Sequence, residues 1–215
     1  MADRLLAFDD AVRVLKSGGV LLLGTDTLPG FHCRADLAQS VARIQALKGR
    51  VFAKSMLVLA GSVDQVSLVT GRLDDRQAAF CRRCWPGPFS LILPAGGALS
   101  RAVNDGGETV AVRVPDLESL CSLVLSVGFP LVSTSANRSG DSPCPDLEAA
   151  LASFANMVDD AWKPRESPGE AAGPARTGPS ALIDVTTWPP VQLRQGPLNM
   201  PPTGPGHLDG GSREV

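Results

Sequence analysis

Short runs of consecutive apolar residues alternate along this chain with longer stretches in which apolar residues recur every three or four positions. Four runs, at residues 20–24, 56–60, 89–93 and 129–132, have the length and continuity of strands buried on both faces. Helical spacing is found in the stretches between them and beyond, over residues 9–17, 37–47, 63–68, 74–84, 117–127 and 146–154. This pattern predicts an α/β fold in which helices pack on a sheet.

Residues 108–115 follow a different rule, in which apolar and polar positions alternate. Val110, Val112 and Val114 fall on one face of the predicted strand, and Thr109 and Arg113 fall on the other. The stretches 179–185 and 191–194 have the pattern of a strand hairpin. A hairpin that follows alternating strands and helices predicts a mixed sheet, parallel and antiparallel, in a single domain.

Two segments lack such periodicity. Residues 161–178 are rich in Pro, Gly, Glu and Arg, which predicts a mobile excursion from the domain. Residues 198–215 consist largely of Pro, Gly and polar residues, and we expect this tail to be disordered.

Polar side chains follow two of the buried strands directly. Thr25, Asp26 and Thr27 come after the first, and the run 129–132 leads into Ser133, Thr134, Ser135, Asn137 and Ser139 before Gly140. Hydroxyls and amides at strand ends make a cluster of donors and acceptors, which suits a small polyanionic or zwitterionic ligand. The alternative is a Ser- and Asn-rich turn that caps the next helix.

Cations gather between the helix at 37–47 and the strand at 56–60. Lys48, Arg50 and Lys54 fit a phosphate clamp, although a solvated helix terminus would explain the same residues. Arg113 stands inside a Val-rich strand, where a charge is costly to bury alone. It therefore needs an anionic partner, either Asp26 or a ligand carboxylate.

Composition limits the remaining classes of protein. The chain has 215 residues, is 44% hydrophobic and carries a net charge of −2, so no global field draws it to nucleic acid or membrane. It has no apolar run of the roughly 20 residues that span a bilayer, and its N-terminus lacks the features of a secretory signal. Five cysteines, an odd number, indicate reduced thiols, and we expect a soluble cytoplasmic protein. Cys81 and Cys84 have redox or half-zinc spacing, but without a second pair or a nearby His they predict buried thiols rather than a metal site.

The polar motifs form a characteristic series: Thr25-Asp-Thr27, Lys48-x-Arg50 with Lys54, Trp85-Pro-Gly-Pro88, Thr109-Val-Ala-Val-Arg-Val-Pro115, Ser133-Thr-Ser-Ala-Asn-x-Ser-Gly140, Pro179-Ser-x-x-Ile-Asp184 and Leu193-Arg-x-Gly196. In this order they resemble the YrdC-type threonylcarbamoyl-AMP synthase family, over about residues 8–197. The resemblance implies a twisted mixed sheet with a large concave cavity. It also implies an enzyme, a nucleotidyltransferase that converts L-threonine, bicarbonate and ATP into threonylcarbamoyl-AMP and pyrophosphate.

The same resemblance implies partners and site residues. Mg²⁺ would arrive with ATP, and a separate transferase complex would use the adenylate to modify adenosine 37 of tRNA. Matching positions for catalysis are Lys48, Arg50, Ser135 and Asn137; for ATP contact Arg50, Lys54, Thr109, Asn137 and Arg194; and for threonine contact Thr27, Arg113, Ser135 and Ser180. Ser133 and Ser139 gain no such support, so we interpret them as structural.

Several positions depart from the family pattern, and most of them bear on the amino-acid pocket. Pro29 replaces an aromatic residue, Leu59 stands where many members have a polar residue, and Pro145 replaces a hydroxyl residue; the others are Val51, Asp116-Leu117 and Ser180-Ala181. Two further hypotheses therefore stay open. One is a diverged paralogue that binds a nucleotide with another amino acid or carbamoyl compound. The other is a module that binds double-stranded RNA or tRNA, against which the net charge of −2 counts.

Overall fold

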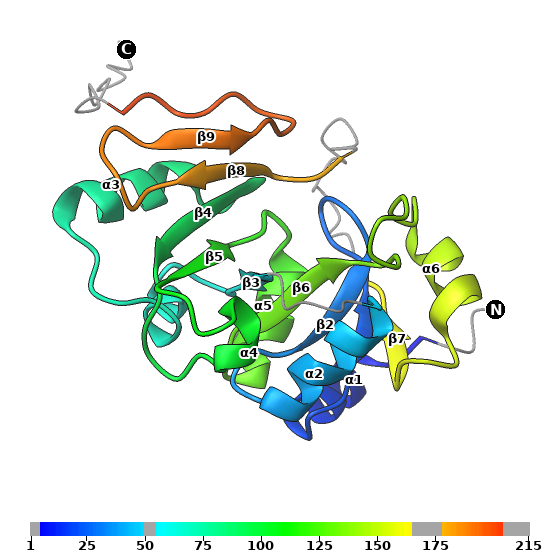
Figure 1. Ribbon diagram of the computed structural model, residues 1–215. Coiled ribbons are helices and arrows are strands. Elements are labelled where there is room, and N and C mark those ends of the chain that lie inside the picture. The colour runs from blue at the N-terminus through cyan, green and yellow to red at the C-terminus, as the bar shows by residue number, and fades with distance from the viewer. Residues whose placement is uncertain (1–4, 50–54, 165–177, 204–215) are drawn as a thin grey trace, which may run out of the picture.

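A single nine-stranded mixed sheet organises the molecule (Figure 1). The computed structural model describes residues 5–49, 55–164 and 178–203. The strand order is β7-β1-β2-β6-β3-β5-β4-β8-β9; the pairs β1/β7, β3/β5 and β4/β8 are parallel and the other pairs are antiparallel. The strands are β1 (Leu21–Leu23), β2 (Gly30–Arg34), β3 (Leu57–Leu59), β4 (Phe89–Pro94), β5 (Thr109–Arg113), β6 (Leu131–Ser135), β7 (Asp160–Trp162), β8 (Ala181–Asp184) and β9 (Val191–Arg194). The predicted mixed α/β fold is confirmed.

Most helices begin and end where the sequence signals predicted. Asp74 caps α3 in a capping box with Gln77, and Asp146 caps α6 by accepting from the Ala149 amide. Gly128 ends α5 with a φ of 85°, a conformation that an L side chain rarely adopts. The helices are α1 (Phe8–Lys16), α2 (Ala38–Leu47), α3 (Asp75–Cys84), α4 (Arg101–Asn104), α5 (Glu118–Val127) and α6 (Leu147–Phe154). Among the described residues, no helix is both long and apolar enough to cross a membrane.

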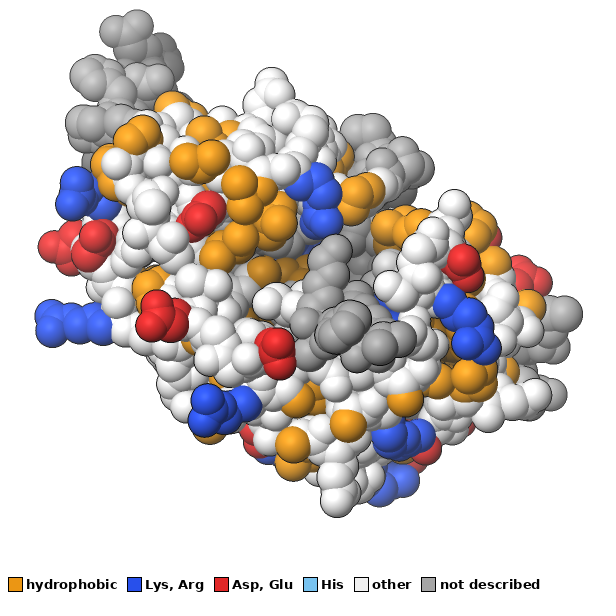
Figure 2. All heavy atoms as spheres, viewed as in Figure 1, with side chains coloured by type: hydrophobic (Ala, Val, Ile, Leu, Met, Phe, Trp, Pro, Cys, Tyr) orange, Lys and Arg blue, Asp and Glu red, His pale blue; other side chains and the backbone are white. Residues whose placement is uncertain are grey.

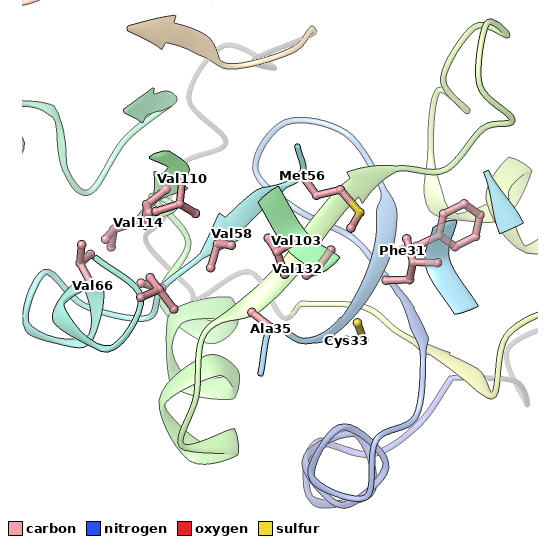
Figure 3. Close-up of a cluster of buried hydrophobic side chains, with 14 of the residues drawn as sticks. Phe31, Cys33, Ala35, Met56, Val58, Val66, Val103, Val110, Val114 and Val132 are labelled. Carbon is pink, nitrogen blue, oxygen red and sulfur yellow. The ribbon is translucent and has the colours of Figure 1, made fainter. Parts of the chain in front are cut away.

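The main core lies on one face of the sheet, under α2, α3, α4 and α6. The alternating strand residues Val58, Val110 and Val132 point into it, together with Phe31 and Met56 (Figure 3). All of these side chains are buried. Because side chains alternate along a strand, the neighbouring residues of the same strands must point to the opposite face.

That opposite face has a helical cover over only part of its width. There α1 and α5 bury Leu21, Leu23, Leu59 and Leu131. Beyond these residues, towards β4, β5 and β8, several side chains of the same face stay partly exposed, among them Ile92, Ala111 and Asp184. Figure 2 shows apolar side chains gathered at the centre of one view of the molecule, over the region where β4 and β5 lie.

The structure corrects several expectations about single elements. Residues 160–162 form strand β7 and pair with β1, with Ala161 and Trp162 buried, so they do not belong to a mobile excursion; residues 165–177 lie outside the described part. Residues 198–203 of the predicted disordered tail are placed: Met200 packs against the core and Arg83 donates to the Pro202 carbonyl at 2.9 Å. Residues 204–215 lie outside the described part. Residues 64–68 form a short 3₁₀ helix.

Candidate active site

A row of partly exposed side chains crosses five strands on the uncovered sheet face. Cross-strand pairing places Ser133 of β6 beside Leu57 of β3, Leu57 beside Ala111 of β5, Ala111 beside Ile92 of β4, and Ile92 beside Asp184 of β8. All five are neither fully buried nor fully exposed. An apolar strip with polar ends can hold a flat, amphipathic ligand against the sheet. Ser133, which the sequence suggested was only structural, is one end of this strip.

Lys48 organises the turn that follows β6. Its Nζ donates to the Ser135 carbonyl at 2.7 Å and to Asn137 Oδ1 at 2.6 Å, and its side chain is buried. Ser135 Oγ also donates to Asn137 Oδ1 at 2.6 Å. The amide of Asn137 donates in turn to the carbonyls of Arg138 and Asp141, both at 2.8 Å. Three of the four predicted catalytic residues thus form one hydrogen-bonded network, which fixes the turn at the end of β6.

Arg113 carries a buried charge on the same face. Its guanidinium contacts the Asp26 carboxylate through Nη2 to Oδ1 at 3.1 Å and Nη1 to Oδ2 at 3.4 Å, and the two side chains are 2% and 7% exposed. Asp26 Oδ2 also accepts from the Asp116 amide at 3.2 Å. The sequence required an anionic partner for Arg113 and named Asp26 as one candidate; the structure confirms that Asp26 is a partner.

Arg194 and Ser180 lie at the far end of the uncovered face. Arg194 pairs in register with Leu182, and its Nε donates to the Ser180 carbonyl at 3.0 Å. Loss of water around the Arg194 guanidinium lowers its pKa, and the positive charge of Arg113 lowers it further. Two like charges that repel each other across one face favour the binding of an anion between them. Ser180 Oγ lies 2.7 Å from the hydroxyl of Ser90, which the sequence analysis did not select although it is a polar residue inside an apolar strand.

Thr27 opens onto a cavity of about 780 Å³ at the other end of the site. Thr25, Asp26 and Pro29 from the same loop line it, with residues from the start of α6 and the end of β7, among them Pro145 and Lys163. The loop conformation is held by Thr25 Oγ1, which accepts from the Thr27 amide at 3.1 Å and donates to the Leu28 carbonyl at 2.8 Å. Thr27 is therefore accessible from this cavity, in a loop that cannot rearrange without breaking these bonds.

The structure treats the remaining residues named from the sequence in three different ways. Thr109 is exposed at the start of β5, on the same face as Arg113, as predicted. Arg50 and Lys54 lie outside the described residues, so the phosphate clamp stays a prediction. Leu59, expected near the amino acid, is fully buried in the core under α1 and α5, where it would not contact a ligand.

Two kinds of titratable group are buried away from this chemistry. Burial raises the pKa of Cys81 and of Cys84 to about 12, so both are neutral thiols, and both pack in the core as predicted. Burial also lowers the pKa of His32 to about 3, which makes it a neutral imidazole. In the described part of the chain, no group of three His, Cys, Asp or Glu side chains could hold a metal ion.

Comparison with known proteins identifies the family. The Sua5/YciO/YrdC family model, which carries the description telomere recombination, matches residues 13–196. Threonylcarbamoyl-AMP synthase of Chromohalobacter salexigens is 35% identical over 163 residues, which cover 74% of this chain and 86% of that protein. The synthase of Pyrococcus abyssi is 31% identical over 87% of this chain and 53% of its own length. The crystal structure of P. abyssi Sua5 complexed with L-threonine superposes with a TM-score of 0.77 at 28% identity, over 88% of this chain and 54% of that chain. This chain belongs to the Sua5/YciO/YrdC family.

Proposed function

We propose that this protein is a threonylcarbamoyl-AMP synthase, a nucleotidyltransferase that uses L-threonine, bicarbonate and ATP. The observation that carries the proposal is the uncovered sheet face, where Ser133 and Asp184 end an apolar strip and where Arg113, held by Asp26, and Arg194 lie on the same side of the sheet. Relatives that bear this name are 29–35% identical to the chain. The solved P. abyssi relative was crystallised with L-threonine.

The proposed substrates divide the site into two regions. Thr27, Arg113, Ser135 and Ser180 would contact threonine; the planar guanidinium of Arg113 suits a carboxylate better than an ammonium would. The nucleotide would contact the second set, which consists of Lys48, Arg50, Lys54, Thr109, Asn137 and Arg194. The Lys48 network supports this division, because it fixes Ser135 and Asn137 in one turn between the two regions.

The reaction needs positioning and charge neutralisation more than acid–base groups. The threonine amine attacks carbon dioxide and loses a proton to give a carbamate; if bicarbonate is the carbon donor, one of its C–O bonds breaks and water leaves. A carbamate oxygen then forms a bond to the α-phosphorus of ATP, while the bond from that phosphorus to the bridging oxygen breaks and pyrophosphate leaves. Fixed cations stabilise the charge that develops on the phosphates, and a rigid turn holds the reactants close together.

Magnesium fits this scheme as part of the nucleotide substrate. The described residues lack a cluster of carboxylates for a resident ion, and the oxygen of the Asn137 amide already accepts two hydrogen bonds. We propose that Mg²⁺ enters on the ATP phosphates, where it would neutralise part of their charge. The protein side chains would then hold the nucleotide rather than the metal.

The product suggests where the protein acts. An acyl adenylate is a reactive donor, so a second enzyme must accept it; we propose a separate transferase complex that modifies adenosine 37 of tRNA in the cytoplasm. Direct contact of this chain with tRNA or other double-stranded RNA is the weaker alternative, because the net charge of −2 offers no general attraction. A salt-dependent affinity for tRNA without ATP would favour it.

Pyrophosphate release tests the proposed function. Purified protein with ATP, Mg²⁺ and bicarbonate should release pyrophosphate only when L-threonine is added, and mass spectrometry should detect threonylcarbamoyl-AMP. The Arg50→Ala variant should lose this activity and remain folded, whereas Arg101→Ala, at the start of α4, should keep it. Equal release with and without threonine would refute the proposal.

A second candidate function is the same chemistry with a different amino acid. It is favoured by Pro29 and Pro145, which replace an aromatic and a hydroxyl residue and both line the cavity beside Thr27. The burial of Leu59 removes one of the reasons for it. Amino acids tested one at a time in the pyrophosphate assay, with calorimetric titration of each, separate the two candidates: threonine should bind best if the first is correct.

A further inference from the structure

Asp26 connects two segments of the site. It lies in the loop between β1 and β2, its carboxylate contacts both terminal nitrogens of Arg113 in β5, and it accepts a hydrogen bond from the Asp116 amide. The loop that carries Asp26 and the stretch from Arg113 to Asp116 are distant in sequence but meet at this one carboxylate. The hydrogen bond from Arg113 Nη1 to Asp26 Oδ2 and the ion pair of Nη2 with Oδ1 restrain the orientation of the guanidinium plane.

The same residue also determines the position of Thr27. Thr25 and Thr27 flank Asp26, and the hydrogen bonds of Thr25 with Thr27 and Leu28 make this loop a compact unit. The Asp26 side chain attaches that unit to Arg113 while part of its surface faces the cavity of about 780 Å³. A change at Asp26 therefore reaches two proposed threonine contacts at once.

Charge gives Asp26 a second role. The positive charge of Arg113 acts on Arg194, and Asp26 is an acidic partner in direct contact with Arg113. Asp26 compensates Arg113 at the amino-acid end only. Arg194 forms no ion pair with an acidic side chain of the described residues, and it lies at the end proposed for the nucleotide.

We propose that Asp26 is a positioning residue for the amino-acid substrate: it orients Arg113 and Thr27, and it controls the affinity for the amino acid without controlling that for ATP. This inference rests on the proposed function. Within the described residues, the contacts of Asp26 are with Arg113 and Asp116 and involve neither the turn held by Lys48 nor the end of the face that carries Arg194.

The experiment compares Asp26→Asn and Asp26→Glu with the full-length wild-type protein. The matched control is Asp36→Asn, because Asp36 also forms a two-point ion pair, with Arg34 at 2.6 and 3.0 Å, away from the site. We measure the KM for threonine and for ATP by pyrophosphate release, ATP binding by calorimetry, and folding by circular dichroism. Asp26→Asn should raise the threonine KM at least about tenfold and leave the ATP values within about twofold. The threonine KM of Asp26→Glu should lie between those of the wild type and of Asp26→Asn. The threonine KM of Asp36→Asn should equal that of the wild type.

Other outcomes would refute the inference. A threonine KM within about twofold of wild type in Asp26→Asn, or an equal rise of both KM values, would reduce Asp26 to a structural residue. If Asp26→Asn does not fold, Asp26→Glu decides by the same criteria, and a failure of both to fold would also identify a structural role. A wild-type protein without threonine-dependent release would instead refute the proposed function, and that result is distinguishable because it appears before any substitution.

Discussion

The Lys48→Met substitution tests the network at the end of β6. Methionine keeps most of the volume of the buried lysine stem but removes the ammonium that donates to Ser135 and Asn137. A hydrogen bond from a charged group contributes about 1.5–3 kcal/mol. Asn137 Oδ1 keeps the bond from Ser135 Oγ, and the variant no longer buries a charge, so the expected loss lies well below the sum of two bonds. We expect the free energy of unfolding to fall by about 2–3 kcal/mol.

Urea denaturation followed by circular dichroism measures this loss, with Lys16→Met, an exposed lysine at the end of α1, as the control. The control should change stability by less than about 0.5 kcal/mol. Threonine-dependent pyrophosphate release should fall about a hundredfold in Lys48→Met even at temperatures where it is folded, because Ser135 and Asn137 lose their fixed positions. A variant as stable as the control and as active as the wild type would refute the reasoning.

Three further predictions concern charged and titratable groups. Arg113→Met should lower the free energy of unfolding by about 3 kcal/mol, because it leaves Asp26 buried without its cation. In urea denaturation, the double variant with Asp26→Asn should recover part of that loss. Additive losses in the double variant would contradict this. Burial lowers the pKa of His32 to about 3, so below about pH 6.5 the unfolded chain takes up a proton at His32 that the folded chain does not. The free energy of unfolding should therefore fall by about 2 kcal/mol from pH 7 to pH 5. The His32→Gln variant should lack that fall. The hydrogen bond from Arg43 holds the pKa of Asp159 below its usual range, so its contribution is present above that range and is lost as the pH falls through the lowered value. The difference in urea midpoint between Asp159→Asn and the wild type should then shrink as the pH is lowered from 6, and a constant difference would contradict the assignment.

The strands that sequence reasoning found are those whose residues are uniformly apolar or strictly alternating. β2 was missed because Gly30, His32 and Arg34 interrupt its apolar pattern. The structure explains Gly30: a Cβ at this position would lie 2.5 Å from the Thr134 carbonyl oxygen of the neighbouring strand. β7 was missed because only three residues pair, next to a segment rich in Pro and Gly. Pairing across distant segments, rather than local propensity, makes both of them strands.

The parts of the site that could be predicted from sequence are those that depend only on the type of a residue and on its position along a strand. Alternation placed Thr109 and Arg113 on one face, and the charge of Arg113 required an acid. The sequence could not predict that Ser133 lies on the uncovered part of the sheet, because this depends on how far α1 and α5 extend over it. The burial of Leu59 follows from the continuously apolar run 56–60, and the structure adds that α1 and α5 provide the cover.

The row from Ser133 to Asp184 also has a consequence for folding. Its five side chains come from positions 57, 92, 111, 133 and 184, so each neighbouring pair requires contact between distant segments of the chain. Contacts of this kind form slowly, because closing a long loop costs entropy before the pairing stabilises it. A shift of one residue in the register of any of these strands would also turn the side chain that this strand contributes to the row towards the main core. Ligand affinity should therefore return only after the complete sheet has formed in its correct register, and recovery of nucleotide binding after dilution from urea would report the last step of refolding.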